Sequence, residues 1–230
     1  MAQQSERAPM KVRPGGDQLS WLYYFTRIVV KIVTAMLGGT TIIGRENIPA
    51  SGPVILAPNH RANIDPPYLT LLTPRQQFYM AKEELFASKK FGNFIRGLGA
   101  FPVKRGEADR AALRFAADHL KAGRILTIFP EGTRSEDGKT LLPAEKGFAL
   151  LAKQTGAPII PIAVEGTEMV LPRGSSKIRR HRVTLTVGKP ITAKEIIEAH
   201  PEAGKDVLTL IGKEVMGEIA KLMGETPPRK

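Results

Sequence analysis

Short apolar runs alternate with helical patterns along most of this chain, and this alternation constrains the fold more than any other feature of the sequence. The apolar runs typical of strands cover residues 40–44, 54–58, 77–81, 100–103, 125–129, 158–164 and 183–187. The helical patterns cover residues 66–72, 87–98, 108–122, 144–154 and 203–223. Strands that alternate with helices predict an α/β domain with a mainly parallel, mixed sheet flanked by helices. Pro158 and Pro161 favour an edge position for the run that contains them.

The length of the chain supports a single α/β domain preceded by a distinct N-terminal segment. The chain has 230 residues, of which 42% are hydrophobic, and this is enough for one good core. Residues 1–16 are polar and show no periodicity, so we expect a flexible lead-in there. A helical pattern then runs over residues 17–37 and ends at Gly38-Gly39. We therefore expect the lead-in and a helix within residues 1–39, and the α/β domain within residues 40–230.

The helical pattern of residues 17–37 is typical of a helix that lies in a membrane interface. One polar stripe recurs at spacings of three and four, and it consists of Ser20, Tyr24, Arg27, Lys31 and Thr34. Apolar residues cover more than half of the circumference, which is wider than a soluble helix normally presents to a core. We expect the helix to lie in the plane of the membrane surface, with its cations at the headgroups. The side chains expected to contact the membrane are Trp21, Tyr24, Phe25, Arg27 and Lys31.

Three alternatives exist for this helix. A signal peptide does not fit, because Lys31 interrupts the apolar part and no small-residue cleavage site follows. A spanning helix is disfavoured, because Arg27 and Lys31 would lie within the segment at roughly 2.5–3.5 kcal/mol each. An ordinary helix packed on the domain stays open as an alternative.

The charge of the chain implies an anionic partner. The formal net charge is +12, which suits nucleic acid, an anionic membrane surface or a phosphorylated substrate. Residues 172–182 are rich in cations and contain no acid, and we expect Arg179, Arg180 and Arg182 to meet the membrane. A nucleic-acid-binding module is disfavoured, because the sequence has no recognised binding motif and only 6% aromatic residues for stacking.

A histidine and an aspartate follow the apolar run at 54–58, in the stretch 59–65 that reads NHRANID. Ligands bind at the carboxyl ends of strands in open α/β sheets, so His60 and Asp65 form a candidate catalytic base with its orienting carboxylate. Asp65 also precedes Pro66, which is typical of a residue that caps a helix. The two roles are compatible, because one oxygen can cap the helix while the other accepts the ring proton of His60.

Two loops after strands carry cations that could hold a phosphate. These loops are Lys104-Arg105-Gly106 and Gly132-Thr133-Arg134. Guanidinium and ammonium groups near backbone amides are the groups that bind phosphate best. We expect both loops to open on the edge of the sheet that carries His60.

Four stretches of this sequence resemble the motifs of the glycerolipid acyltransferases. Asn59-His60 followed by four residues and Asp65 is similar to the first motif of that family. Residues 101–105 (FPVKR) resemble the second, residues 129–135 (FPEGTRS) match the third, and residues 157–161 (APIIP) are similar to the fourth. The motifs occur in the family's order and span roughly residues 40 to 190 of the chain.

The resemblance implies transfer of a fatty acyl group from a thioester, either of acyl carrier protein or of coenzyme A, to a hydroxyl of a lysophospholipid. The implied acceptor is 1-acylglycerol 3-phosphate, with another lysophospholipid or glycerol 3-phosphate as the alternative. No further cofactor is implied, and the implied location is the cytoplasmic face of the cell membrane. The resemblance assigns catalysis to His60 and Asp65, and it assigns acceptor binding to Lys104, Arg105, Glu131, Gly132, Thr133 and Arg134.

The residues present favour direct attack by the acceptor hydroxyl. The chain has no cysteine, no Gly-x-Ser-x-Gly elbow and no serine within residues 59–65, so no enzyme nucleophile is evident. A metal hydrolase built on His60 and Asp65 is a different class of enzyme. His119, His181 and His200 follow no ligand spacing, so we expect no metal site.

Overall fold

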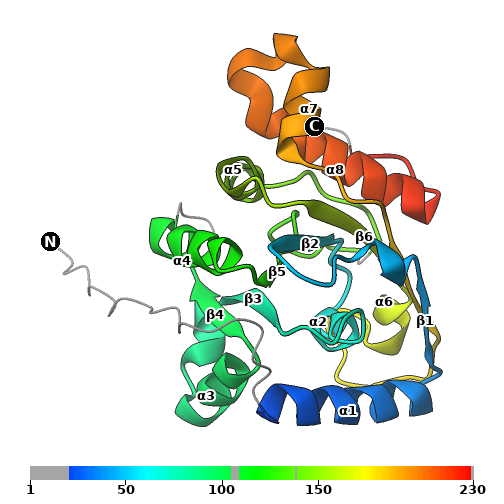
Figure 1. Cartoon of the computed structure of the whole chain (residues 1–230). Helices are drawn as coiled ribbons and strands as arrows, with labels where there is room; N and C mark the ends of the chain where they lie inside the picture. The colour runs from blue at the N-terminus through cyan, green and yellow to red at the C-terminus, as the bar shows by residue number, and fades with distance from the viewer. Residues whose placement is uncertain (1–20, 105–108, 138, 229–230) are drawn as a thin grey trace, which may run out of the picture.

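A seven-stranded mixed sheet forms the centre of the molecule (Figure 1). The computed structural model describes residues 21–104, 109–137 and 139–228, so the expected lead-in and the start of the N-terminal helix lie outside the described residues. The strands are β1 (Thr40–Ile43), β2 (Val54–Pro58), β3 (Gln77–Lys82), β4 (Ala100–Val103), β5 (Ile125–Thr127), β6 (Ile159–Glu165) and β7 (Val183–Val187). Their order across the sheet is β1-β7-β6-β2-β5-β3-β4.

Five neighbouring strands run parallel, and the other two run against them. β6, β2, β5, β3 and β4 form the parallel group. β7 pairs antiparallel with β6, and β1 pairs parallel with β7. The predicted mixed, mainly parallel sheet flanked by helices is therefore confirmed. Because the five strands run the same way, their carboxyl ends share one edge of the sheet.

The prediction of an edge position for the run at 158–164 is wrong, because β6 lies between β2 and β7. Pro158 precedes the strand. Pro161 lies inside the strand and is tolerated because its missing N–H would point toward β7, at the end of the β6–β7 pairing. The carbonyl of Pro161 accepts a hydrogen bond from the N–H of Gly188 at 2.8 Å, on the β7 side. The β6–β7 pairing starts one residue later, at Ile162 and Val187. The missing donor therefore falls at the end of the ladder, where it costs at most the reciprocal bond to Gly188.

Helices cover both faces of the sheet and bury two clusters of apolar side chains. One face is covered by α4 (Arg110–Lys121), α5 (Lys146–Thr155), α7 (Ala193–Ala199) and α8 (Val207–Met223). The other face is covered by α2 (Asp65–Leu69) and α6 (Thr167–Val170), with α1 (Trp21–Met36) packed on α2. Successive residues of β2 enter opposite clusters: Ile55 and Ala57 enter one, and Val54 and Leu56 the other. This double burial explains why the β2 run is apolar at every position.

Shorter elements complete the chain. The helix α3 (Lys89–Gly97) connects β3 to β4, after the 3₁₀ turn η2 (Glu83–Phe86). Two further 3₁₀ turns are η1 (Arg45–Asn47) and η3 (Pro201–Asp206), the second of which lies between α7 and α8. Figure 1 places α1 and α3 at one end of the molecule and α7 at the other.

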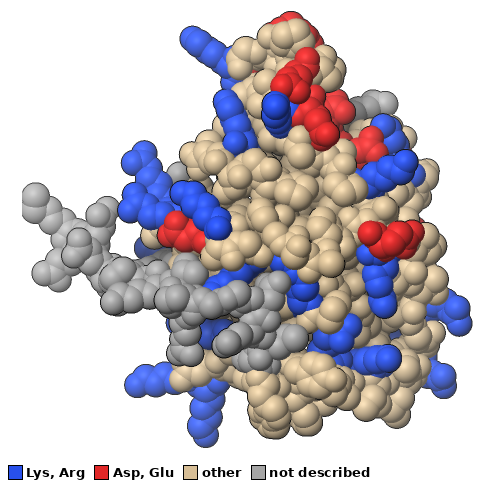
Figure 2. Space-filling model, viewed as in Figure 1, with Lys and Arg blue, Asp and Glu red and all other residues tan. Residues whose placement is uncertain are grey.

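The helix α1 packs on the domain with its polar side and turns its apolar side outward. Tyr23 and Thr34 are its buried residues, and the Tyr23 hydroxyl donates to the carbonyl of Arg75 at 3.4 Å. The exposed apolar side chains are large, and they are Trp21, Tyr24, Phe25, Ile28, Val29, Ile32, Val33 and Met36. In Figure 2 the surface over α1, at the bottom of the view, carries few charged side chains. None of the helices in the described part of the chain is both long and apolar enough to cross a bilayer.

One prediction for α1 needs correction. Arg27 was expected to face lipid headgroups, but its Nε–H donates to the carbonyl of Thr70 at 3.0 Å. Arg27 therefore lies on the side of α1 that faces the domain, where it satisfies a carbonyl at the end of α2. Lys31 is exposed, as expected.

Candidate active site

The loop that follows β2 is anchored to the neighbouring strand by an asparagine. The Asn59 side chain accepts a hydrogen bond from the N–H of Val164 at 2.7 Å and donates one to the carbonyl of Val164 at 3.1 Å. The side chain thereby takes the place of a strand residue against β6. This fixes the position of the next residue, His60, at the carboxyl end of β2. The sequence motif contained Asn59, but its role could not be read without knowing that β6 is the neighbour.

The predicted contact between His60 and Asp65 is present. Nδ1 of His60 lies 2.7 Å from Oδ2 of Asp65, and the aspartate is fully buried. The same oxygen accepts hydrogen bonds from the N–H groups of Arg61 at 2.8 Å and Ala62 at 2.9 Å. An ionised Asp65 requires the proton of the neutral imidazole on Nδ1, so the lone pair lies on Nε2. Among the described residues, Nε2 has no hydrogen-bond partner, and it is therefore available to a substrate.

The prediction that Asp65 caps the following helix is wrong. Ile64 occupies the capping position, and Asp65 is the first residue of α2. The next two residues, Pro66 and Pro67, have no N–H group, so the first turn offers few donors to a capping carboxylate. The carboxylate instead turns back to the N–H groups before it. Its other oxygen, Oδ1, is buried and accepts no hydrogen bond from the described residues.

Phe129, which follows β5, holds the plane of the His60 ring. The two rings stack with their centroids 3.9 Å apart and their planes at 20°. The His60 side chain is only 8% exposed, so the stack and the bond to Asp65 leave the ring little freedom. The negative face of the phenyl ring also attracts an imidazole that gains a proton. Phe129 lies in the third motif, yet a role against His60 was not predicted.

Glu131 supports the backbone of His60. Its Oε1 accepts a hydrogen bond from the His60 N–H at 2.8 Å, and its Oε2 accepts one from the N–H of Leu142 at 2.9 Å. Burial raises the pKa of this carboxyl to about 7, although the two backbone hydrogen bonds act in the opposite direction. Both oxygens are used within the protein, so in this structure Glu131 supports the loop that carries His60.

Arg61 ties the His60 loop to three distant segments. Its guanidinium forms ion pairs with Glu168 of α6 at 3.2 Å and with Glu225, just after α8, at 2.7 Å. It also donates to the carbonyl of Lys139 at 3.3 Å. Arg61 is only 8% exposed, so these partners offset part of the cost of burying its charge, although its Nε has no hydrogen-bond partner among the described residues. No sequence signal connects Arg61 with Glu225, because these residues are far apart in the chain.

The predicted phosphate-binding cations lie on two loops at different distances from His60. β5, which leads to Arg134, is next to β2, whereas β4, which leads to Lys104, is three strands away. At about 4.8 Å per strand the second separation is roughly 14 Å. Arg134 therefore lies in the loop nearer to His60. Lys104 is exposed, and Arg105 lies outside the described residues.

The glycine of the third motif is required by the shape of its loop. Gly132 has a φ of 65°, and a Cβ at this position would lie 2.9 Å from Cγ of Glu145. Thr133 is exposed and Arg134 is half-buried. The carbonyls of Arg134 and Ser135 accept hydrogen bonds from Arg173, which belongs to the basic stretch 172–182. Among the described residues, no group of three or more histidine, aspartate and glutamate side chains could hold a metal ion.

Comparisons with known proteins agree with this geometry. The model of the Acyltransferase family matches residues 39–165, which include the His60 loop and the loop after β5. The chain is 31% identical over 173 residues to the 1-acyl-sn-glycerol-3-phosphate acyltransferase of Bacillus subtilis (strain 168), covering 74% of this chain and 82% of that protein. It is 30% identical over 215 residues to the protein of the same name from Streptococcus pneumoniae, covering 92% of this chain and 76% of that protein.

A solved structure has the same fold. The crystal structure of the 1-acyl-sn-glycerophosphate (LPA) acyltransferase PlsC from Thermotoga maritima superposes with a TM-score of 0.71. Its sequence is 28% identical, and the match covers 87% of this chain and 78% of that one. Given these matches and the paired His60 and Asp65, this chain belongs to the Acyltransferase family.

Proposed function

We propose that this chain is a 1-acyl-sn-glycerol-3-phosphate acyltransferase, which moves a fatty acyl group from a thioester to the sn-2 hydroxyl of 1-acylglycerol 3-phosphate. The observation that carries the proposal is the 2.7 Å contact between His60 and Asp65, with Nε2 left free at the carboxyl edge of the sheet. The names of the relatives from Bacillus subtilis and Streptococcus pneumoniae support the choice of acceptor. The product is phosphatidic acid, a precursor in phospholipid biosynthesis.

The proposed reaction needs one base and no covalent enzyme intermediate. Nε2 of His60 takes the proton of the acceptor hydroxyl, and the oxygen attacks the carbonyl carbon of the thioester. The tetrahedral intermediate collapses with cleavage of the C–S bond, and the leaving sulfur receives the proton from His60. The imidazole returns to its neutral form. Asp65 stabilises the cationic imidazole between these steps, and Phe129 keeps the ring in the plane that the proton transfer requires.

The donor is a thioester of acyl carrier protein or of coenzyme A, and it serves as a co-substrate in place of a resident cofactor. The acceptor phosphate is held by Arg134, with Lys104 and Arg105 as further cations. The adjacency of β5 and β2 supports Arg134 as the principal contact. The roughly 14 Å between β2 and β4 can be bridged in two parts. The glycerol unit of the acceptor separates its hydroxyl from its phosphate, and the side chain of a cation after β4 spans the rest.

The lipid acceptor requires the enzyme to work at a membrane surface, and α1 is suited to hold it there. The outward side of α1 is apolar, and Lys31 is exposed along it. Arg179, Arg180 and Arg182 are exposed on the basic stretch 172–182, which is joined to the end of α1 by a 2.7 Å hydrogen bond from the N–H of His181 to the carbonyl of Leu37. We therefore propose peripheral binding to the anionic cytoplasmic face of the cell membrane.

A panel of acceptors tests the function and the phosphate contact together. The purified chain should acylate 1-acylglycerol 3-phosphate and should act poorly on a 1-acylglycerol that lacks the phosphate. Arg134→Ala should raise the apparent KM for the phosphorylated acceptor roughly tenfold or more, because a charged hydrogen bond contributes about 1.5–3 kcal/mol. Both thioester donors are assayed in parallel, and His60→Ala serves as the inactive reference.

Two outcomes would contradict the proposal. Preference for glycerol 3-phosphate or for another lysophospholipid would change the acceptor and leave the reaction type intact. An equal loss with phosphorylated and unphosphorylated acceptors would remove Arg134 from the phosphate site.

A further inference from the structure

The helix α3 carries two exposed phenylalanines for which the proposed reaction has no use. Phe91 is 48% exposed and Phe94 is 43% exposed. We propose that α3 is a second membrane-contacting element, which inserts these two rings among the lipids while Lys89 and Lys90 meet anionic headgroups. The proposal rests on the proposed function only for the lipid nature of the acceptor.

The local sequence turns both rings outward. Ser88 begins the helix, and its hydroxyl accepts a hydrogen bond from the N–H of Phe91 at 3.5 Å. Gly92 is buried, and a Cβ there would lie 3.0 Å from the carbonyl oxygen of Phe86, so this side of α3 packs closely on η2. Phe91 and Phe94 are three residues apart and therefore share one face of the helix. That face is directed away from the packed side.

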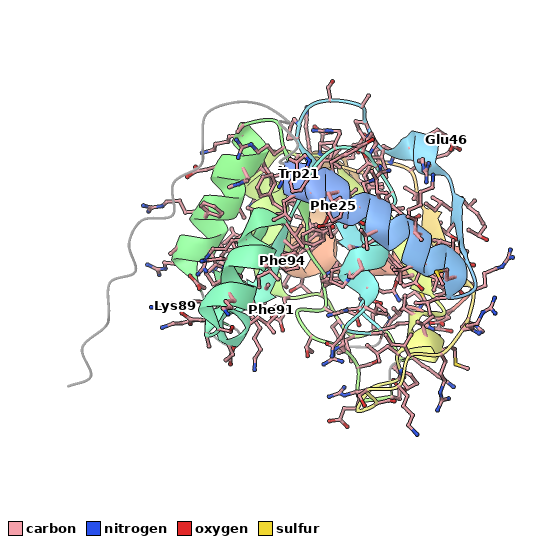
Figure 3. The ribbon with its side chains drawn as sticks, turned by 90° about the horizontal axis from the view of Figure 1, so that it is seen from below. Trp21, Phe25, Glu46, Lys89, Phe91 and Phe94 are labelled. Atoms are coloured by element: carbon pink, nitrogen blue, oxygen red, sulfur yellow. The ribbon has the colours of Figure 1, made fainter. Side chains whose placement is uncertain are left out.

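The exposed rings continue the apolar side of α1. The two helices touch where α3 ends and α1 begins, because a Cβ on Gly97 would lie 2.7 Å from Cδ2 of Leu22. Figure 3 shows Phe91 and Phe94 of α3 on the same face of the molecule as Trp21 and Phe25 of α1. The rings of Trp21 and Phe25 stack with centroids 5.5 Å apart. The two helices together therefore present exposed apolar side chains on one face of the molecule, more than either helix presents alone.

The charges around α3 favour an anionic bilayer as the partner. Lys89 and Lys90 begin the helix and are exposed, and α3 contains no acidic residue. The guanidinium of Arg96 lies over the ring of Phe86 at 4.6 Å, at the other end of the helix. The nearest acids along the chain belong to η2, where Glu84 pairs with Lys82 at 2.9 Å. Exposed phenyl rings flanked by two lysines that form no ion pair with the described residues are typical of a surface that binds lipid headgroups and acyl chains together.

A second contact has a mechanical consequence for catalysis. One helix lying in the interface fixes the height of the domain but leaves it free to roll about the helix axis. α3 lies beside α1, so a contact through Phe91 and Phe94 removes this roll. The edge of the sheet that carries His60 is then held at a constant distance from the bilayer surface.

Vesicle binding by matched variants tests the proposal. The variants are Phe91→Gln with Phe94→Gln, Lys89→Gln with Lys90→Gln, and the control Lys194→Gln with Lys205→Gln. The control removes two exposed cations around α7, at the opposite end of the molecule from α1 and α3 (Figure 1). Binding is measured on vesicles of equal parts phosphatidylcholine and phosphatidylglycerol. We expect the phenylalanine pair to weaken binding roughly tenfold, the α3 lysine pair to weaken it in a salt-dependent way, and the control to bind more tightly than the α3 lysine pair.

A label placed on α3 gives a readout that does not depend on the fold of those variants. The chain has no cysteine, so Phe94→Cys and Lys194→Cys can each carry one polarity-sensitive fluorophore. We expect the label at 94 to shift to the blue on vesicles and to be quenched by spin-labelled acyl chains, and the label at 194 to do neither. An unchanged label at 94 in a vesicle-bound protein would overturn the proposal. So would a response to an acidic acyl carrier protein, or to protein concentration, in the absence of any response to vesicles.

The failure of this proposal is distinguishable from failure of the proposed function. Acyl transfer to a dispersed short-chain acceptor is measured for the same variants. If the label enters the bilayer but no acceptor is acylated, the function is wrong and the α3 contact stands. If acylation proceeds but the label stays in water, the α3 contact is wrong and the function stands.

Discussion

At the scale of a single residue, the substitution Asp65→Asn tests how much the negative charge of Asp65 contributes to catalysis. Oδ2 accepts the three observed hydrogen bonds, whereas Oδ1 accepts none from the described residues. In Asp65→Asn the carbonyl oxygen can keep the three bonds, and the amide group can take the place of Oδ1. The shape of the loop can be preserved while the negative charge is lost, with an amide N–H₂ group in place of an oxygen that has no hydrogen-bond partner among the described residues. We expect kcat to fall roughly a hundredfold to ten-thousandfold, because the cationic His60 is no longer stabilised.

The unfolding midpoint of Asp65→Asn, measured by circular dichroism, is the control for that experiment. A variant that folds with an unchanged midpoint and turns over at the wild-type rate would show that Asp65 only shapes the loop. His60→Ala sets the baseline without a base.

Glu131 predicts a dependence of stability on pH with a defined sign. Its pKa rises from an ordinary value of 4.5 to about 7 in the folded protein. Between these two values the unfolded chain loses the proton while the folded protein keeps it, so the folded protein binds more protons. The free energy of unfolding should therefore fall as the pH rises from about 4.5 to about 7, by at most roughly 3 kcal/mol.

Urea unfolding of the wild type and of Glu131→Gln, at about pH 5 and about pH 8, isolates this contribution. Glutamine does not titrate, so the fall assigned to Glu131 should be absent from the variant. Identical pH profiles for the two proteins would place the pKa of Glu131 near its ordinary value.

At the scale of an element, α1 shows an inverted distribution of side chains, because Tyr23, Arg27 and Thr34 face the domain while its large apolar residues face outward. Ile28 and Ile32 lie one turn apart on the outward side. We expect Ile28→Ser with Ile32→Ser to weaken binding to anionic vesicles roughly tenfold to a hundredfold, because the two side chains leave the acyl region. Co-sedimentation with vesicles of known composition measures the effect.

Ile43→Ser is the matched control, because Ile43 of β1 is exposed to a similar degree as Ile32. Neither Ile28 nor Ile32 supports the core. The variant should therefore keep an unfolding midpoint within a degree or two of the wild type, because substitutions at exposed sites change the free energy of unfolding by only about ±0.5 kcal/mol. Activity on a vesicle-borne acceptor should fall more than activity on a dispersed one. Unchanged vesicle binding in the α1 variant would show that other surfaces of the protein bind the membrane.

At the scale of the whole molecule, local patterns predicted the strands, most of the helices and one site contact, whereas the helices α6 and α7 and the distant contacts were missed. Alternating apolar runs predicted the strands, and the motif around His60 predicted its contact with Asp65, because both signals lie within a few residues. The position of β6 was missed, because the effect of Pro161 depends on which strand is its neighbour. The partner of Arg61, Glu225, was missed because only the folded chain brings these residues together.

The roles of the third-motif residues show the same limit. The sequence identified Glu131 and Phe129 as part of a motif, but it did not reveal that both contact His60 from the loop after the neighbouring strand β5. The expected acceptor contacts of Lys104 and Arg134 stay predictions. Likewise, the pattern of residues 17–37 indicated an interfacial helix, yet only the packing of α1 on α2 showed that Arg27 faces inward.

The pairing of β1 with β7 has a consequence for the order of events during synthesis. Thr40 pairs with Val183, so β1 cannot pair with β7 until most of the chain has left the ribosome. The helix α1, directly before β1, is complete long before that moment, and its outward residues need no partner from the later chain. If α1 binds the membrane as proposed, a nascent chain could be captured at the bilayer by α1 while its sheet is still open. The last steps of folding would then take place on the same surface to which the finished enzyme is proposed to bind.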